Sequence, residues 1–262
     1  MINVQNVSKT FKLNKQQKKE LQTTASSINA VNGVSFQCTP GRIYSLLGPN
    51  GAGKTTTLRM IATILQTTSG EIHVCDYSVN EKPSLVRSKI GFLTGSTNLY
   101  DRLSPGEIVE YFAKLHGMEK SLYTERMDML FTQLGIHEFS KKRIGQMSTG
   151  MKQKVSIARS MIHDPEVVIF DEPTSGLDVI TANNIIELIR QCKDEGKTVI
   201  FSSHIMSEVD LLCDDLAIIS KGDLVYQNTM DNFRAEFSDI SLTEAFIRVV
   251  QDSKTLQNDP TL

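Results

Sequence analysis

Apolar residues fall into two kinds of pattern along this chain. Short and nearly continuous apolar runs occur at residues 42–47, 166–170, 198–202 and 216–220, and such runs are typical of strands that are buried on both faces. Between the second and third runs, apolar residues recur at helical spacing from residue 185 to 192. This alternation predicts an α/β fold in which helices cover both faces of a parallel sheet.

The middle of the chain has a different pattern, in which helical periodicity dominates from about residue 99 to 161. One apolar stripe runs from Ile108 to Leu115, and another runs from Tyr123 to Leu134. Stripes of this spacing are the faces that amphipathic helices turn toward a core. We therefore expect a helical subdomain, at about residues 98–162, that is inserted into the α/β pattern.

The two ends of the chain are less regular. Residues 2–11 and 30–36 have strand-like patterns. The segment between them, about residues 12–29, is polar and lysine-rich, which predicts an exposed and mobile loop. A final amphipathic helix is predicted to begin near Leu242, and residues 251–262 are expected to form a disordered tail.

Composition and charge argue against several classes of protein. The chain has 28 Lys and Arg against 30 Asp and Glu, a net charge of −2, so it lacks the basic excess of a protein that binds nucleic acid. We expect no membrane-spanning segment, because no run of about 18 apolar residues occurs. We also expect no secretory signal, because the N-terminal residues MINVQNVSKTF do not resemble one. The four cysteines show no metal-type spacing, which predicts free thiols in a reducing cytosol.

One segment carries a specific chemical signal. The residues from Gly48 to Thr55 read GPNGAGKT and lie between an apolar run and a helical pattern, which is the context of the phosphate-binding G-x-x-x-x-G-K-[ST] loop. Glycines let backbone N–H groups turn toward phosphate oxygens. Lys54 is placed to contact the terminal phosphates, and the hydroxyl of Thr55 to hold Mg²⁺. The sequence therefore predicts that ATP or GTP binds to Gly48, Pro49, Asn50, Gly51, Ala52, Gly53, Lys54, Thr55 and Thr56.

Acidic and imidazole side chains follow two of the predicted strands. The run at residues 167–170 ends in Asp171 and Glu172, and phosphate-loop proteins place a Mg²⁺-holding Asp at such a strand end. We expect Asp171 to hold Mg²⁺ and Glu172, which points the other way, to polarise a water; the alternative is a solvated acidic turn. His204 follows the strand at 198–202, at the sheet edge where ligand sites form. It is either a contact to the terminal phosphate or a structural residue.

Five motifs occur in a defined order along the chain: GPNGAGKT, MSTGMKQK, VVIFDEP, SGLD and SSH. Together they make residues 2–250 resemble the ATP-binding subunit of ABC transporters. The resemblance implies a single ABC ATPase domain at 1–250, with an α/β P-loop NTPase core and parallel sheet, an N-terminal antiparallel β subdomain and an inserted α-helical subdomain. It also implies ATP and Mg²⁺ as ligands, ATP hydrolysis, and a peripheral position at the cytoplasmic face of the membrane beside a polytopic permease subunit.

The same resemblance implies roles for individual residues. ABC subunits form head-to-tail dimers, in which the signature segment of one copy closes over the ATP of the second copy. Glu172 would be the general base for water, and His204 would contact the γ-phosphate. The other implied contacts are those of Ser148, Thr149 and Gly150 with the second copy's ATP, of Asp178 with the dimer seam, and of Phe11 with adenine. The alternative for Phe11 is a core residue, because a single Phe at a strand end commonly packs in the core.

Two motifs depart from the family's usual pattern. The signature reads MSTGM rather than LSGGQ, with Thr149 and Met151, and Gly95 stands where most members have a Gln that reaches Mg²⁺. Both departures are similar to the sodium-exporting, NatA-type branch, which implies Na⁺ efflux. The alternatives are export of a drug, lipid or polysaccharide, a soluble ABC ATPase outside transport, and a nucleotide-binding regulator without turnover. The expected permease contacts lie after the central strand, at Leu99, Tyr100 and Leu103.

Overall fold

The computed structural model describes residues 1–20, 22–94 and 99–257, and its larger sheet has six strands. The strand order is β10-β9-β3-β8-β7-β6, with parallel pairing from β9 through to β6 and an antiparallel β10 at one edge. The parallel sheet predicted from the buried apolar runs is confirmed. Its strands are β3 (Ile43–Leu47), β6 (Ile90–Thr94), β7 (Val167–Asp171), β8 (Thr198–Ser203), β9 (Asp215–Ser220) and β10 (Asp223–Thr229).

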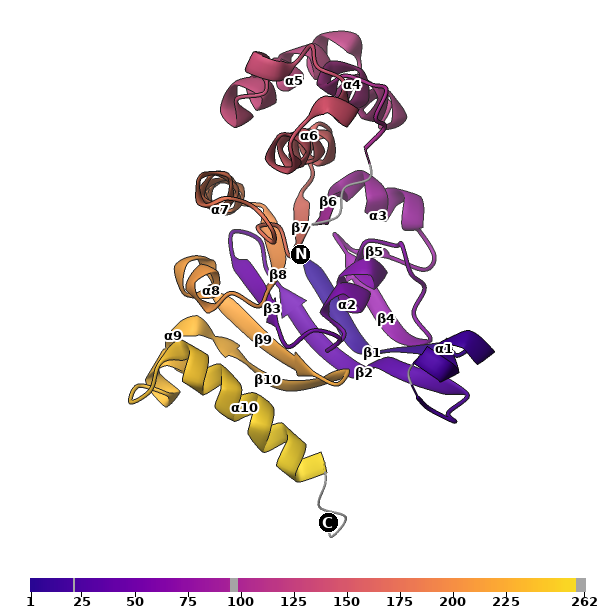
Figure 1. The fold of residues 1–262 in the computed structure, drawn as a ribbon, viewed down its shortest axis with the longest axis vertical. Coiled ribbons are helices and arrows are strands. Elements are labelled where there is room, and N and C mark those ends of the chain that lie inside the picture. Colours follow the sequence, from indigo (N-terminus) through magenta and orange to yellow (C-terminus); the bar gives the residue numbers. More distant parts are fainter. Residues whose placement is uncertain (21, 95–98, 258–262) are drawn as a thin grey trace.

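A second, antiparallel sheet is built mainly from the N-terminal part of the chain. Its four strands have the order β2-β1-β4-β5, which confirms the implied antiparallel subdomain. Figure 1 shows these strands beside β3, with α2 close to them. The strands are β1 (Ile2–Lys12), β2 (Ser27–Cys38), β4 (Ser69–Val74) and β5 (Tyr77–Ser78).

The segment at about 12–29 differs from the expected loop. It contains a short helix, α1 (Lys15–Glu20), between the ends of β1 and β2. The backbone N–H of Asn14 donates to the side chain of Gln17 at 2.9 Å, and the N–H of Gln17 donates to the side chain of Asn14 at 2.8 Å. This reciprocal pair is a capping box, which satisfies two N–H groups at the start of the helix.

The inserted helical subdomain lies between β6 and β7, as predicted. Figure 1 shows it at one end of the molecule, with α4, α5 and α6 grouped beyond the ends of those two strands. Ser104 begins α4 with a capping box, because its side chain and that of Glu107 bond each other's backbone N–H groups. The helices are α4 (Pro105–Leu115), α5 (Lys120–Leu134) and α6 (Thr149–Met161), with single 3₁₀ turns at His137–Phe139 and Ile144–Gln146.

The other helices pack around the two sheets. Residues 251–257, expected in a disordered tail, belong to the last helix, α10 (Leu242–Gln257). A capping box between Ser241 and Glu244 starts this helix, and Ala245 and Val250 are buried. Residues 258–262 lie outside the described part of the chain. The remaining helices are α2 (Lys54–Ile61), α3 (Pro83–Lys89), α7 (Val179–Asp194), α8 (Met206–Leu212) and α9 (Met230–Glu236).

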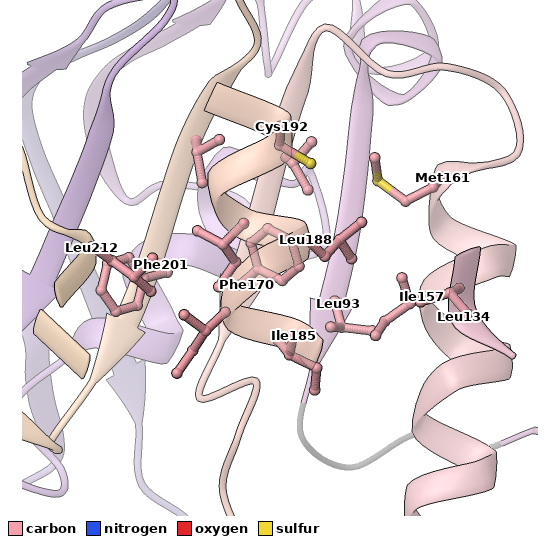
Figure 2. Packing of buried hydrophobic residues seen from close by; sticks show 14 of the residues in the cluster. Leu93, Leu134, Ile157, Met161, Phe170, Ile185, Leu188, Cys192, Phe201 and Leu212 are labelled. Atoms are coloured by element: carbon pink, nitrogen blue, oxygen red, sulfur yellow. The ribbon is translucent and has the colours of Figure 1, made fainter. Parts of the chain in front are cut away.

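The strand β7 is buried on both faces, which fixes the position of its carboxyl end. Val168 and Phe170 pack in one hydrophobic cluster, while Val167 and Ile169 pack in the other. Figure 2 shows Phe170 in the first cluster beside side chains of α7 and α6. Full burial of one such side chain stabilises the fold by about 1.5–3 kcal/mol. The end of β7 is therefore a rigid support for the residues that follow it.

None of the helices within the described ranges combines the length and the apolar content needed to span a bilayer.

Candidate active site

The phosphate loop predicted from the sequence connects the end of β3 to the start of α2. Its backbone is closely enclosed at two glycines that have positive φ angles: 153° at Gly48 and 113° at Gly53. A Cβ atom at Gly48 would lie 2.2 Å from the Ile219 carbonyl oxygen, and one at Gly53 would lie 2.4 Å from the Ala30 carbonyl oxygen. Any larger residue would collide with neighbouring backbone, so these positions require glycine.

Lys54 is buried at the first position of α2 and its ammonium lies across the loop. Its Nζ donates hydrogen bonds to the carbonyls of Gly48 at 2.6 Å and Pro49 at 3.3 Å. The same Nζ lies 3.8 Å from Glu172 Oε1. Burial lowers the pKa of Lys54, while the nearby carboxylates of Glu172 and Asp171 act to raise it. The fold thus holds one cation between the loop and the acidic end of β7.

Thr55 and Asp171 form a pair of oxygen donors at the base of the cavity. The Thr55 hydroxyl donates to Asp171 Oδ1 at 2.9 Å. The buried Asp171 carboxylate also accepts a hydrogen bond from the Ser202 hydroxyl at 2.8 Å, which orients it. Hydroxyl and carboxylate oxygens are hard donors of the kind that Mg²⁺ binds alongside substrate phosphates and waters. The residues present therefore fit the predicted Mg²⁺ site.

Glu172 has an unusual backbone conformation that turns its side chain toward the cavity. Its φ angle is 49°, in the left-handed region that non-glycine residues seldom adopt. Two hydrogen bonds from its N–H hold this conformation, to the Ser202 carbonyl at 3.2 Å and to the Ser202 hydroxyl at 3.1 Å. Ser202, which the sequence analysis did not single out, thus orients both Asp171 and Glu172.

His204 follows the end of β8 and lies beside Glu172; its contact with the terminal phosphate stays a prediction. His204 Nδ1 is 3.4 Å from Glu172 Oε1. The side chain of Glu172 is 29% exposed and lines the cavity, whereas that of His204 is 46% exposed and is not among the described lining residues. A carboxylate at this position, beside an ammonium and an imidazole, can accept a proton from a water bound in the cavity.

Lys54, Thr55, Asp171 and Glu172 line one open cavity of about 620 Å³. Ala30, Arg59, Thr94 and Ser175 also line it, although no site role was predicted for them. Arg59 lies one helical turn after Thr55, so its i, i+4 spacing was a usable signal; Ala30 comes from β2, and no local pattern points to it. The described lining comprises Ala30, Asn50, Gly51, Ala52, Gly53, Lys54, Thr55, Thr56, Arg59, Thr94, Asp171, Glu172 and Ser175.

The predicted signature segment lies apart from this cavity, at the start of α6. Ser148 is the N-cap of the helix, and its hydroxyl accepts from the Met151 N–H at 3.3 Å. Ser148 and Thr149 are exposed, and the signature residues are absent from the described lining of the cavity. Gly150 faces the start of α7, because a Cβ added there would lie 3.1 Å from Thr181 Oγ1.

Asp178 caps α7 next to the signature. Its carboxylate accepts hydrogen bonds from the Thr181 N–H at 3.0 Å and from the Thr181 hydroxyl at 2.8 Å. The N–H bond is the main reason that the pKa of Asp178 lies below its ordinary value. The starts of two helices, α6 and α7, therefore meet at Gly150 and Thr181, on the signature side of the molecule.

Two residues that were expected to belong to the site, Phe11 and Gly95, are not placed at the cavity by the described part of the structure. Phe11 pairs with Ile28 across the β1–β2 hairpin, and the Lys9 ammonium lies 5.1 Å from the centre of its ring. Phe11 is not among the described residues that line the cavity, so its contact with adenine stays a prediction. Gly95 lies outside the described residues.

Comparisons with known proteins agree with this geometry. A family model described as "ABC transporter" matches residues 31–175, and a second model, of an AAA domain, matches residues 141–210. The chain is 41% identical to the ABC transporter ATP-binding protein NatA of Bacillus subtilis (strain 168), over 82% of this chain and 87% of that protein. It is 36% identical to the linearmycin resistance ATP-binding protein LnrL of the same organism, over 74% of this chain and 63% of that protein.

A solved structure provides the comparison of folds. It is the dimeric structure of a post-hydrolysis state of an ATP-binding cassette bound to ADP and Pi. The similarity has a TM-score of 0.77 at 25% sequence identity, and it covers 88% of this chain and 99% of that chain.

Proposed function

Since the chain belongs to the ABC transporter family, we propose that it is the subunit that binds and hydrolyses ATP and so energises export through a separate membrane subunit. One observation carries this proposal. A buried lysine, a hydroxyl–carboxylate pair and a second carboxylate beside an imidazole all converge on a single cavity. Those are the groups that phosphoryl transfer to water requires.

In the proposed reaction a water attacks the terminal phosphorus of ATP, the bond from that phosphorus to the bridging oxygen breaks, and ADP and phosphate leave. Catalysis comes from positioning and from stabilising charge. Lys54 places its ammonium on the terminal phosphate oxygens. Glu172 accepts the proton of the attacking water, while His204 contacts the same phosphate. Thr55 and Asp171 would hold Mg²⁺, which neutralises phosphate charge when it is bound.

We also propose that two copies of the chain complete the site. The signature, Ser148–Gly150, offers a hydroxyl and free N–H groups at the start of α6, which suit an anionic phosphate. Ser148 and Thr149 are exposed, Gly150 is half-buried, and all three lie away from the chain's own cavity. A second copy that supplies its phosphate loop would make use of them. The dimeric form of the similar cassette supports this arrangement.

A membrane subunit is the third part of the proposal. A groove of about 610 Å³ lies between the core and the helical subdomain, and we name it the docking groove. Apolar side chains of Phe92, Phe112 and Leu115 line it together with Arg159. Tyr100, one of the expected permease contacts, is exposed and reaches this region through Tyr111, whose ring packs edge-on against both Tyr100 and Phe112. The groove suits an apolar segment of a permease at the cytoplasmic face of the membrane.

Na⁺ is the proposed substrate, on the strength of the likeness to NatA. Export of a drug or lipid is the alternative that the likeness to a linearmycin resistance protein favours. An ATPase outside transport is less well supported, because the balanced charge of −2 gives no electrostatic basis for binding nucleic acid.

The dimer and the active site can be tested together. We expect Glu172→Gln to bind ATP and to remain as a dimer, because the amide cannot accept the proton of the attacking water. Size-exclusion chromatography with and without ATP and Mg²⁺ measures this. Glu166→Gln is the matched control, since that acid is exposed and pairs with Lys89; it should stay monomeric after turnover. A Glu172→Gln variant that never dimerises would contradict the proposal.

The transport role needs a separate experiment. The chain is co-expressed with a candidate permease subunit, the complex is purified and placed in vesicles, and ATP hydrolysis is measured with Na⁺, with K⁺ and with linearmycin. Stimulation by Na⁺ alone supports Na⁺ efflux, and stimulation by the drug alone supports the alternative. Hydrolysis that is independent of the membrane protein and of every solute would count against a transport role.

A further inference from the structure

A buried carboxylate that the proposed reaction does not use lies behind the active site. Glu208, on α8, is 8% exposed. It accepts hydrogen bonds from the Thr174 hydroxyl at 2.5 Å and from the Ser203 hydroxyl at 2.8 Å. No Lys, Arg or His within the described ranges forms an ion pair with it. Ionised side chains are seldom buried without strong partners, so its position calls for a physical reason.

The two hydroxyls belong to the two segments that carry the reacting groups. Thr174 follows Glu172 by two residues, and Ser203 immediately precedes His204. The Ser203 hydroxyl also accepts a hydrogen bond from the Ile205 N–H at 3.0 Å. One carboxylate thus joins the loop after Glu172 to the backbone on both sides of His204.

The geometry points to Glu208 as a positioning residue, which sets the distance between Glu172 and His204 in the proposed hydrolysis. Both hydroxyls donate to the Glu208 carboxyl group, so both are turned toward it. Without this bridge, hydrogen bonds between the two loops would still come from Ser202, but those hold the N–H of Glu172 and do not tie Thr174 to the segment that carries His204. The inference rests on the proposed function.

The signature helix is connected to the same bridge. Gln153, buried on α6, donates from Nε2 to the Pro173 carbonyl at 3.1 Å. Pro173 lies between Glu172 and Thr174. The loop is therefore held from one side by the signature helix and from the other by Glu208, which leaves it little freedom to shift.

Replacing Glu208 tests the inference in the purified full chain. In Glu208→Ala we expect kcat for ATP hydrolysis to fall by about 10- to 100-fold, since a displacement of about 1 Å can cost that much. KM for ATP should stay within about twofold of wild type, because Lys54 and Thr55 still bind the phosphates. Glu208→Gln should restore most of kcat. Its amide keeps the size of the carboxyl and can bridge the same two hydroxyls once one of them turns to accept.

A neighbouring core residue serves as the control for lost stability. Val209 is buried on the same helix and does not take part in the bridge. Val209→Ala should lower the unfolding temperature while kcat, measured well below that temperature, stays within about twofold of wild type. Thr174→Val and Ser203→Ala should each lower kcat, and the double variant should lose little more than the worse single one, because both hydroxyls act through one carboxylate.

The outcomes separate the inference from the function on which it rests. If wild type hydrolyses ATP and Glu208→Ala matches its kcat, the positioning role is overturned. The same holds if Val209→Ala and Glu208→Ala lose kcat equally for an equal drop in unfolding temperature. If wild type hydrolyses no ATP, alone or with its membrane subunit, the proposed function falls and the inference falls with it.

Discussion

The nucleotide cavity and the docking groove have nearly equal volumes, about 620 and 610 Å³, but they are built in different ways. Half of the cavity lining comes from one continuous segment, residues 50–56, and the reacting groups come from strand ends. The groove draws its lining from dispersed positions between Ala62 and His163. Chemistry that depends on backbone N–H groups can be encoded in a short loop, whereas an apolar docking surface needs several elements already packed together.

The two sites also differ in how their charges are balanced. In the cavity, Lys54 lies within reach of Glu172, and Asp171 is held by hydroxyls. In the groove, Arg159 lies over the Phe112 ring at 5.0 Å and bonds only the Ser156 hydroxyl, with no carboxylate partner in the described part of the chain. In the cavity the cation and the carboxylates thus lie close to one another, whereas in the groove the Arg159 cation lies among apolar side chains. The proposed apolar permease segment could therefore carry one acidic side chain opposite Arg159.

The largest expected effect comes from a substitution in the nucleotide cavity that leaves the docking groove intact. Lys54→Ala should lower ATP turnover by at least about 100-fold, because each charge-assisted hydrogen bond to phosphate contributes about 1.5–3 kcal/mol. A steady-state ATPase assay measures this, and binding of the membrane subunit should be unchanged. Lys89→Ala is the control, since Lys89 pairs with Glu166 outside the cavity. Equal turnover in wild type and Lys54→Ala would refute the site assignment.

The next effect comes from a substitution in the docking groove that leaves the nucleotide cavity intact. Leu115 is 64% exposed and lines the groove, so Leu115→Glu should fold normally and weaken association with the membrane subunit by about tenfold, the cost of one lost apolar contact. ATP binding by the isolated chain should not change. Leu122→Glu, on an exposed face of the same subdomain and outside the described groove lining, is the matched control. If both variants co-purify with the membrane subunit as wild type does, the groove is not the docking site.

The third effect is on stability and its pH dependence, and leaves the activity of each site at neutral pH unchanged. Two stacked imidazoles line the groove, His116 and His163, with ring centres 3.7 Å apart. Burial, together with His116, lowers the pKa of His163 to about 4. Between about pH 6.5 and 4 the unfolded chain therefore binds a proton that the folded chain does not, so stability is complete above pH 6.5 and falls as the pH drops. We expect a loss on the order of 3 kcal/mol from this residue.

Urea unfolding across this pH range measures the effect. His163→Phe keeps a ring to stack on His116 and should flatten the pH dependence relative to wild type. His137→Phe, at an exposed position, keeps the buried pair and should retain the wild-type slope. Equal slopes in wild type and His163→Phe would show that the buried pair does not contribute.

The contrast between the two sites also explains which parts of the fold and of the site could be predicted from the sequence alone. The phosphate loop, the acids after β7 and His204 were found because each follows a strand whose apolar run is readable. The cavity contact of Ala30 and the bridge at Glu208 depend on how distant segments meet, so no local pattern reveals them. The helix α1 was missed although its signal was local: Asn14 and Gln17 have capping-box spacing, which a lysine-rich composition obscured.

Because the backbone at position 172 is left-handed, the residue that would be most stable there, glycine, is not the residue that catalysis needs, Glu172. A non-glycine residue with a φ of 49° carries a cost of about 1–2 kcal/mol that glycine avoids. Glycine at 172 would therefore raise the melting temperature while it removes the carboxylate. A library of variants screened only for heat resistance would drift toward an inactive protein at this position, and a screen for turnover would have to accompany any attempt to stabilise the chain.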